Sequence, residues 1–400
     1  MIADTNYPAD DLSNPLMYQL DNWQTLFDSF RKQKPVFFCE SSPNGPHWSI
    51  TRYADIKVIE MDHQTFSSEK GGVRIDGGLA FSFLSSDPPR HTRERKMVSA
   101  ISNPLNLARY EVLIRDRTRE LLSGLPRNRV FDWNSVVSSE LSSMMLSTLF
   151  DLPLDTRLKL SYWSDVASRD PMSPDALVHT EQDRKRIIAE MVDEFRTLLR
   201  ERSTQEPKLD LISLMAHNPI FFEMTEEQVI GNLILLVIGG YDTTKSAMSG
   251  GILELSERPD QRREVVNNPD LIPNLVDEII RFQTPLIHMS RTATCDYPLR
   301  DQIIRAGDRV ALWYVSGNRD EDVFDDPHQF MITRPNASKH LSFGAGIHYC
   351  IGARLAKAQI RILWEQIIEQ GLTIDLAGEP KWLHSNFARG FTYLPVTVKA

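Results

Sequence analysis

The feature that most constrains this sequence is an uninterrupted helical pattern of roughly thirty residues. It begins at Thr225-Glu226-Glu227-Gln228, which has the form of a capping box, in which two side chains satisfy free amides at the start of a helix. It continues until Pro259, well beyond the length of an ordinary globular helix. A helix of this length favours a helix-dominated fold.

The middle of this pattern is occupied by residues that weaken a helix, Gly239-Gly240-Tyr241-Asp242-Thr243-Thr244. Each Gly costs ~1 kcal/mol relative to Ala, and Thr is also a poor helix former. One interpretation is a close helix crossing, which small residues permit. The other is a groove in which a ligand meets the backbone. The helix alone does not choose between the two.

The rest of the chain is expected to be mainly α with minor β, in a single domain over residues 1–400, because no repeat or flexible linker interrupts it. The expected elements are strands at 35–39 and 47–51 around a turn at 42–46, mostly helices over 106–257, a strand at 309–314, a last helix from about Ala353 and a strand-like tail that ends at Val398.

Composition excludes several classes of protein. An apolar share of 41% and a charged share of 25% are ordinary for a soluble globular chain. The net charge of −9 argues against a general nucleic-acid binder. Three cysteines (Cys39, Cys295 and Cys350) make no disulfide framework, which suits a reducing cytoplasm. The longest apolar run, near 233–238, is too short to span a bilayer, and the N-terminus does not resemble a signal peptide, so we expect a cytoplasmic protein without a transmembrane anchor.

The most informative segment for chemistry is the Gly-rich stretch Phe343-Gly344-Ala345-Gly346-Ile347-His348-Tyr349-Cys350-Ile351-Gly352, which ends just before a helix. A helix N-terminus lowers a thiol pKa, and the thiolate is the form that binds metals. Three interpretations compete: a buried structural Cys, a nucleophile and a metal ligand. A dinucleotide-binding turn is excluded, because Tyr349 occupies the position of the third glycine.

This stretch resembles the haem-ligand signature of the cytochromes P450, with Phe343, Gly346, Cys350 and Gly352 at the matching positions. Other stretches resemble further motifs of the family in the family's order: Asp87–Arg95, Gly239-Gly240-x-Asp242-Thr243, Glu278-x-x-Arg281, His288–Ala293 and Phe324-x-x-Pro327-x-x-Phe330. The resemblance implies a helix-rich lobe and a small β-rich lobe, with haem between the long central helix and the Cys loop.

The resemblance also implies roles for individual residues. Haem b (iron protoporphyrin IX) would take Cys350 as its thiolate ligand, with Gly240, Phe343 and Gly352 beside it. The haem propionates would be bound by His91, Arg95, Arg291 and His348. Asp242 and Thr243 would deliver the protons that oxygen activation consumes, although Thr243 could instead bond to the helix carbonyl four residues earlier.

For Glu278 and Arg281, the hydrophobic pattern and the family resemblance lead to different predictions. On a helical wheel they lie opposite the apolar face, so the pattern predicts an exposed ion pair. The resemblance instead implies a buried network beneath the haem loop. The family often carries an Arg where this chain has Gln329, and Arg334 is the candidate substitute, so the third member of the network stays open.

The implied activity is a monooxygenase that uses dioxygen and two electrons from a separate ferredoxin and its reductase. A group of basic residues suits docking of an acidic ferredoxin: Arg90, Arg93, Lys96, Arg354, Lys357 and Arg361. Thr284–Met289 and Trp313–Asp320 resemble the bacterial alkane and fatty-acid terminal hydroxylases. The residues expected to line an apolar substrate pocket are Leu235, Leu236, Leu286, Ile287, Met289 and Phe391.

Two alternatives remain at this point. A steroid side-chain hydroxylase is the closer one, since related groups share this style of sequence. A non-enzymatic haem-thiolate sensor or carrier is the other, and the Asp242-Thr243 pair argues against it because a carrier has no need of proton delivery.

Overall fold

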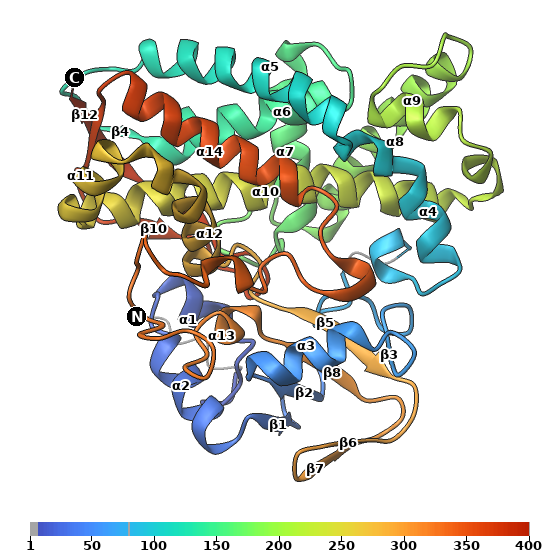
Figure 1. The fold of residues 1–400 in the computed structure, drawn as a ribbon. Coiled ribbons are helices and arrows are strands. Elements are labelled where there is room, and N and C mark those ends of the chain that lie inside the picture. Colours follow the sequence, from blue (N-terminus) through green and yellow to red (C-terminus); the bar gives the residue numbers. More distant parts are fainter. Residues whose placement is uncertain (1–6, 79–80, 400) are drawn as a thin grey trace.

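The long helix expected before Pro259 is helix α10, Glu226–Glu257, which runs through the helical part of the molecule (Figure 1). Its capping box is formed: the Gln228 amide donates to Thr225 Oγ1 over 3.4 Å, and the Thr225 amide donates to Gln228 Oε1 over 2.8 Å. Both ends of the helix are thus confirmed, and α10 contacts the helices that surround it.

The computed structural model describes residues 7–78 and 81–399, so the N-terminal residues judged unlike a signal peptide lie largely outside it. The α-helices are α1 (Pro15–Gln19), α2 (Gln24–Gln33), α3 (Tyr53–Met61), α4 (Arg90–Val98), α5 (Pro104–Ser123), α6 (Glu140–Leu149), α7 (Arg157–Ser168), α8 (Glu181–Ser203), α9 (Leu211–Ala216), α10, α11 (Pro259–Asn267), α12 (Ile272–Gln283), α13 (Tyr314–Gly317) and α14 (Ala353–Glu369). None of the helices in this described part combines the length and apolar character needed to cross a lipid bilayer.

Most of the strands form a smaller β-rich part, drawn below the long helices in Figure 1, and the others are drawn beside those helices at the left. The strands are β1 (Val36–Cys39), β2 (His47–Ile50), β3 (Phe66–Ser67), β4 (Phe131–Asp132), β5 (Met289–Ala293), β6 (Tyr297–Leu299), β7 (Gln302–Ile304), β8 (Arg309–Leu312), β9 (Thr373–Leu376), β10 (Lys381–Trp382), β11 (Phe391–Tyr393) and β12 (Pro395–Lys399). The largest sheet has the order β1-β2-β8-β5-β3, in which β2 pairs with β8 in parallel and the other neighbours are antiparallel. The expected mainly α fold with minor β, including the β1–β2 hairpin, is confirmed.

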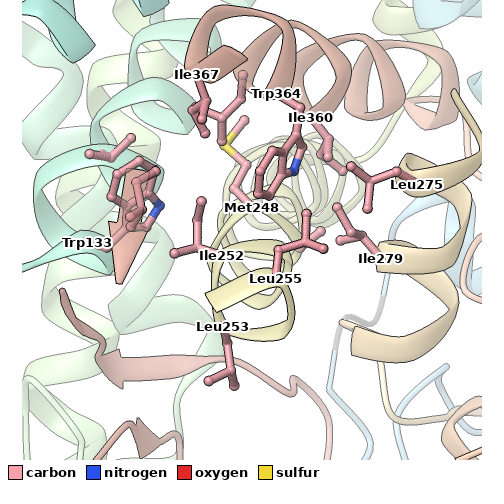
Figure 2. Packing of buried hydrophobic residues seen from close by; sticks show 14 of the residues in the cluster. Trp133, Met248, Ile252, Leu253, Leu255, Leu275, Ile279, Ile360, Trp364 and Ile367 are labelled. Atoms are coloured by element: carbon pink, nitrogen blue, oxygen red, sulfur yellow. The ribbon is translucent and has the colours of Figure 1, made fainter. Parts of the chain in front are cut away.

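The C-terminal half of α10 is the centre of a large hydrophobic cluster (Figure 2). Met248, Ile252 and Leu255 are buried against apolar side chains of α12 and α14, among them Ile279 and Trp364. A Cβ at Gly251 would lie 2.7 Å from Ile279 Cδ1, so this glycine lets α12 approach α10 closely. Packing of its C-terminal half against α12 and α14 therefore fixes the direction of the α10 axis. The position of the middle turns of α10 follows from that direction.

One acidic side chain is buried at the end of this helix. Glu254 is 7% exposed, and Oε2 lies 2.6 Å from Nη1 of Arg258. Burial raises the pKa of the Glu254 carboxyl to about 7, although Arg258 and Arg389 act in the opposite direction. The folded chain therefore holds this proton more tightly than the unfolded chain does.

This burial predicts a pH-dependent stability. Because the pKa of Glu254 rises on folding from 4.5 to about 7, its stabilising contribution is complete below pH 4.5 and is lost as the pH rises through about 7. The variant Glu254→Gln should therefore gain stability relative to the native chain between pH 5 and 8, by at most roughly 3 kcal/mol. Denaturant unfolding across this range measures the difference, with the more exposed neighbour Glu257→Gln as control. Equal pH slopes in both variants would contradict the assignment.

Candidate active site

Cys350 lies in a tight loop that ends at the first turn of α14. Its backbone N–H donates to the Phe343 carbonyl over 2.9 Å, which closes the loop. Gly344 and Gly346 have φ of +68° and +64°, and a Cβ at Gly346 would lie only 2.5 Å from the carbonyl oxygen of Glu60 in α3. The glycine spacing therefore reflects both the turn and the close contact with α3, and it sets where the sulfur lies.

The electrostatics of the thiol differ from the expectation drawn from the helix N-terminus. Burial raises the pKa of the Cys350 thiol above its ordinary value, while the amides of Gly352 and Ala353 and the Arg95 guanidinium act to lower it. The groups expected to lower the thiol pKa are present, but the desolvation of the thiolate outweighs their effect. Three hydrogen-bonding or cationic groups around one sulfur are what a metal-bound thiolate needs.

Two of the four expected propionate-binding residues are buried imidazoles that lie beside each other. The ring centroids of His91 and His348 are 4.4 Å apart. His348 Nε2 lies 3.0 Å from Ser68 Oγ, but His348 Nδ1 and both nitrogens of His91 have no hydrogen-bond partner among the described residues. Burial, together with the nearby arginines, lowers the pKa of His91 to about 4 and that of His348 to about 2. Buried ring nitrogens are normally hydrogen-bonded, so these unpartnered nitrogens indicate a binding position for a polar group next to the two rings.

The other two expected residues, Arg95 and Arg291, surround the same histidines. Arg291 is buried and donates to Glu60 Oε1 over 2.8 Å, and Arg95 donates to the carbonyl of Tyr349. Because Glu60 Oε2 also accepts from the Ala345 amide over 2.8 Å, one carboxylate joins Arg291 to the Cys loop. No sequence motif indicates Glu60, whose helix is short and mostly apolar. This set of cations and free imidazole nitrogens fits the acidic groups of a haem, with Cys350 as the iron ligand.

The two glycines in the middle of α10 have different roles. A Cβ at Gly240 would lie 2.9 Å from Leu146 Cδ1 of α6, so Gly240 serves a close helix crossing. A Cβ at Gly239 would meet no atom within 4 Å, and Gly239 is exposed. Gly240 therefore serves a helix crossing and Gly239 faces open space, whereas contact of Gly240 with the cofactor stays a prediction.

Asp242 and Thr243 point in different directions. Thr243 Oγ1 donates to the Gly239 carbonyl over 3.2 Å, the bond to the fourth preceding residue considered above. Asp242 is buried against α7, where it accepts from Lys245 Nζ over 2.8 Å and from Ser164 Oγ over 3.2 Å. Burial by itself would raise the pKa of Asp242, but Lys245 holds it below its ordinary value. Lys245, which the motifs did not indicate, therefore keeps the carboxylate ionised.

Glu278 and Arg281 are fully buried, which corrects the exposed pair that the helical wheel predicts. Arg281 donates to both carboxylate oxygens of Glu278 over 2.7 Å. Arg334 is the third member of the network, with its Nε 3.1 Å from each of the same oxygens. The backbone carbonyl of Gln329 accepts from both arginines. The helical-wheel prediction is wrong because the segment with Gln329 and Arg334, far along the chain, covers the polar side of α12.

The expected substrate-lining residues divide into two groups. Leu235 and Leu236 are partly exposed and lie one turn before Gly239, so all three share the open face of α10. Leu286 is also partly exposed. Ile287 instead is fully buried in a cluster with Phe27 and Trp313, and so belongs to the core.

Two further residues of that set are buried as well. Phe391 packs on Trp382, with ring centroids 4.2 Å apart, in the cluster around the C-terminal half of α10. The structure therefore assigns Phe391 to packing, as it does Ile287. Met289 is 8% exposed at the start of β5 and packs with the sheet.

The chain is similar to known proteins along nearly its whole length. The family model described as Cytochrome P450 matches residues 171–371. The chain is 31% identical to linalool 8-monooxygenase of Pseudomonas putida, over 97% of this chain and 98% of the other. It is 32% identical to the methyl-branched lipid omega-hydroxylase of Mycobacterium tuberculosis, over 93% of this chain and 90% of the other. The solved structure of Cytochrome P450-153 from Novosphingobium aromaticivorans is 38% identical, with a TM-score of 0.90 over 98% of this chain and 99% of the other.

The buried carboxylate network predicts a large loss of stability on its removal. Glu278→Gln should lower the free energy of unfolding by ~3–5 kcal/mol, because it leaves Arg281 and Arg334 buried without a counter-charge. The matched control is Glu190→Gln, whose partner Arg186 is exposed, and which should change stability little. Thermal unfolding of the purified variants measures the effect. Similar melting temperatures for the two variants would refute the role assigned to the network.

Proposed function

The chain belongs to the cytochrome P450 family, and on that premise we propose that it hydroxylates the terminal methyl group of a linear alkane or a fatty acid. A haem held by the Cys350 thiolate supplies the activation of dioxygen and the insertion of one oxygen atom into an apolar C–H bond. His91, Arg95, Arg291 and His348 would hold the acidic groups of that haem, and the loop amides would hold the sulfur.

The observation that supports an apolar substrate is the open face of α10. Gly239 has free space where a side chain would be, and Leu235 and Leu236 flank it on the same side of the helix. An opening bordered by leucines favours a hydrocarbon over a polar group. The similarity to an omega-hydroxylase of lipids supports attack at the end of the chain.

Thr243 lies on this same open face, one turn after Gly239, and is partly exposed. Its hydroxyl donates to the Gly239 carbonyl, so the same proton is available to a stronger acceptor that enters the space. Asp242 is buried on the side of the helix that packs on α7, and its ion pair with Lys245 keeps the carboxylate ionised. We assign Thr243 to proton donation at the site and Asp242 to proton supply from α7.

We also propose that electrons come from a separate ferredoxin. Four of the six basic residues expected to dock it are engaged in ion pairs with acidic side chains: Arg90, Arg93, Lys357 and Arg361. Lys96 and Arg354 are exposed and have no ion pair within the described ranges, so they offer free positive charge near the Cys loop. Full turnover with a nicotinamide alone, without ferredoxin and reductase, would contradict this part of the proposal.

The substrate proposal predicts which ligands enter the site. Linear alkanes and fatty acids should shift the haem absorbance of the purified ferric protein toward the high-spin form, because they displace water from the iron. Gly239→Val should weaken this binding at least tenfold, since it fills the open space, whereas the exposed Gly378→Val should not. A shift with a sterol alone would support a steroid side-chain hydroxylase instead.

The position of Thr243 predicts uncoupled turnover. With a surrogate ferredoxin and reductase, Thr243→Ala should consume reductant at a rate near the native one, yet release mostly hydrogen peroxide in place of the hydroxylated product. The neighbouring Thr244 is buried away from the open face, so Thr244→Ala is the matched control and should remain coupled. Product, peroxide and reductant are measured together. Normal coupling in Thr243→Ala would remove Thr243 from the mechanism, and no turnover in any variant would favour a sensor or carrier.

A further inference from the structure

Three potential metal ligands meet in the β-rich part, well apart from α10 in Figure 1. Cys39 ends β1 and His47 begins β2, and the two residues are direct cross-strand neighbours in the hairpin. Asp11 comes from the segment before α1. One carboxylate oxygen, the sulfur and one imidazole nitrogen of these residues all lie within 4.8 Å of one another.

All three side chains are buried, with Asp11 and His47 at 0% and Cys39 at 3% exposure. Asp11 Oδ2 and His47 Nε2 are buried without a hydrogen-bond partner in the described part of the chain. Asp11 also has no ion pair there, so a fully buried carboxylate is left without a cation. A buried group of this kind is costly unless it is paired or coordinates a metal.

The outer contacts orient the free atoms toward the centre of the cluster. His47 Nδ1 lies 3.0 Å from the Gly45 carbonyl, which places the hydrogen on Nδ1 and the free lone pair on Nε2. Asp11 Oδ1 accepts from the backbone N–H of Ser13 over 2.8 Å and from its hydroxyl over 2.6 Å. Asp11 and His47 thus each have one polar atom occupied and the other free, as in metal sites whose ligands are held by neighbouring groups, and Cys39 adds a single sulfur atom.

We propose that Asp11, Cys39 and His47 bind a zinc ion. Sulfur, imidazole nitrogen and carboxylate oxygen are the donors that Zn²⁺ takes, with water in the fourth position of a tetrahedral site. Binding displaces the thiol proton, and the two negative ligands then cancel the charge of the ion. Ligand atoms of a tetrahedral zinc lie roughly 3.5 Å apart, so atoms that are now up to 4.8 Å apart would have to move closer by about 1 Å when the ion binds.

A Cys-His-Asp hydrolase is the other arrangement that uses these residue types, and the structure does not favour it. Its His would bond the carboxylate through Nδ1, but here Nδ1 faces the Gly45 carbonyl. The sulfur is also buried, with no access for a substrate. Asn44 Nδ2 also donates to Ser13 Oγ over 2.9 Å, which connects the N-terminal segment to the turn of the β1–β2 hairpin. This bond is consistent with a metal that joins the same two segments.

The test is the zinc content of the haem-loaded protein, in which Cys350 is occupied by iron. Elemental analysis after incubation with zinc and dialysis should give about one zinc per haem iron, and X-ray absorption should show one Zn–S distance of about 2.3 Å with the remaining ligands at about 2.0–2.1 Å. Cys295 is exposed, so Cys295→Ser is the matched control and should keep its zinc, whereas Cys39→Ser should lose at least nine-tenths of it.

Asp11→Asn is the second variant, in case Cys39→Ser does not fold. It should bind zinc at least tenfold more weakly while it keeps the native haem absorbance. Addition of a chelator should lower the melting temperature of the native chain and of Cys295→Ser but not that of Cys39→Ser. The proposal is overturned if the native chain takes up no zinc, or if Cys39→Ser holds as much zinc as Cys295→Ser. None of these measurements depends on which substrate the haem site oxidises.

Discussion

The Glu278 carboxylate is the group on which the arrangement of the Cys loop most depends. It accepts from Arg281, from Arg334 and from the backbone N–H of Met331, all in the protein interior. Arg281 in turn donates to the carbonyls of Asn318 and Pro327. The Asn318 side chain then bonds the Leu341 amide and the Ser342 hydroxyl, just before the loop begins. A chain of direct bonds thus connects one acidic residue of α12 to the segment that presents the sulfur.

The features that the sequence predicts well are those decided locally. The ends of α10, the β1–β2 hairpin and the start of α14 follow from a capping box, a turn and a Gly-rich loop, each of which acts within a few residues. Glu278 shows where local reasoning stops, because its burial is caused by Arg334 and the segment around it, 56 residues later in the chain. The same holds for Gly240, whose partner Leu146 lies on another helix.

The family resemblance predicts functional residues that hydrophobic periodicity does not indicate. It identifies motifs, however, and does not predict the directions in which their side chains point. It implies one shared function for Asp242 and Thr243, yet these neighbours lie on different sides of α10, one ion-paired to Lys245 and the other on the open face. It also groups Ile287 and Phe391 with the pocket, although both pack into separate hydrophobic clusters. Whether a side chain lines a cavity depends on its neighbours in three dimensions, which a motif does not record.

The parallel pairing of β2 with β8 has a consequence for how the chain acquires its structure. Strand β2, His47–Ile50, cannot pair with β8 until Arg309–Leu312 has been synthesised. The central pair of the largest sheet thus joins residues about 260 positions apart. Contacts of such long range are formed late, because closing the intervening loop costs entropy before any contact compensates for it. During synthesis the β1–β2 hairpin therefore emerges with its β2 edge unpaired, and this edge stays unpaired until about three-quarters of the chain has been made. Helices α6 to α10, which contact one another and are close in sequence, are free to assemble in that interval. Much of the helical part therefore precedes the sheet whose Arg291 is joined through Glu60 to the Cys loop.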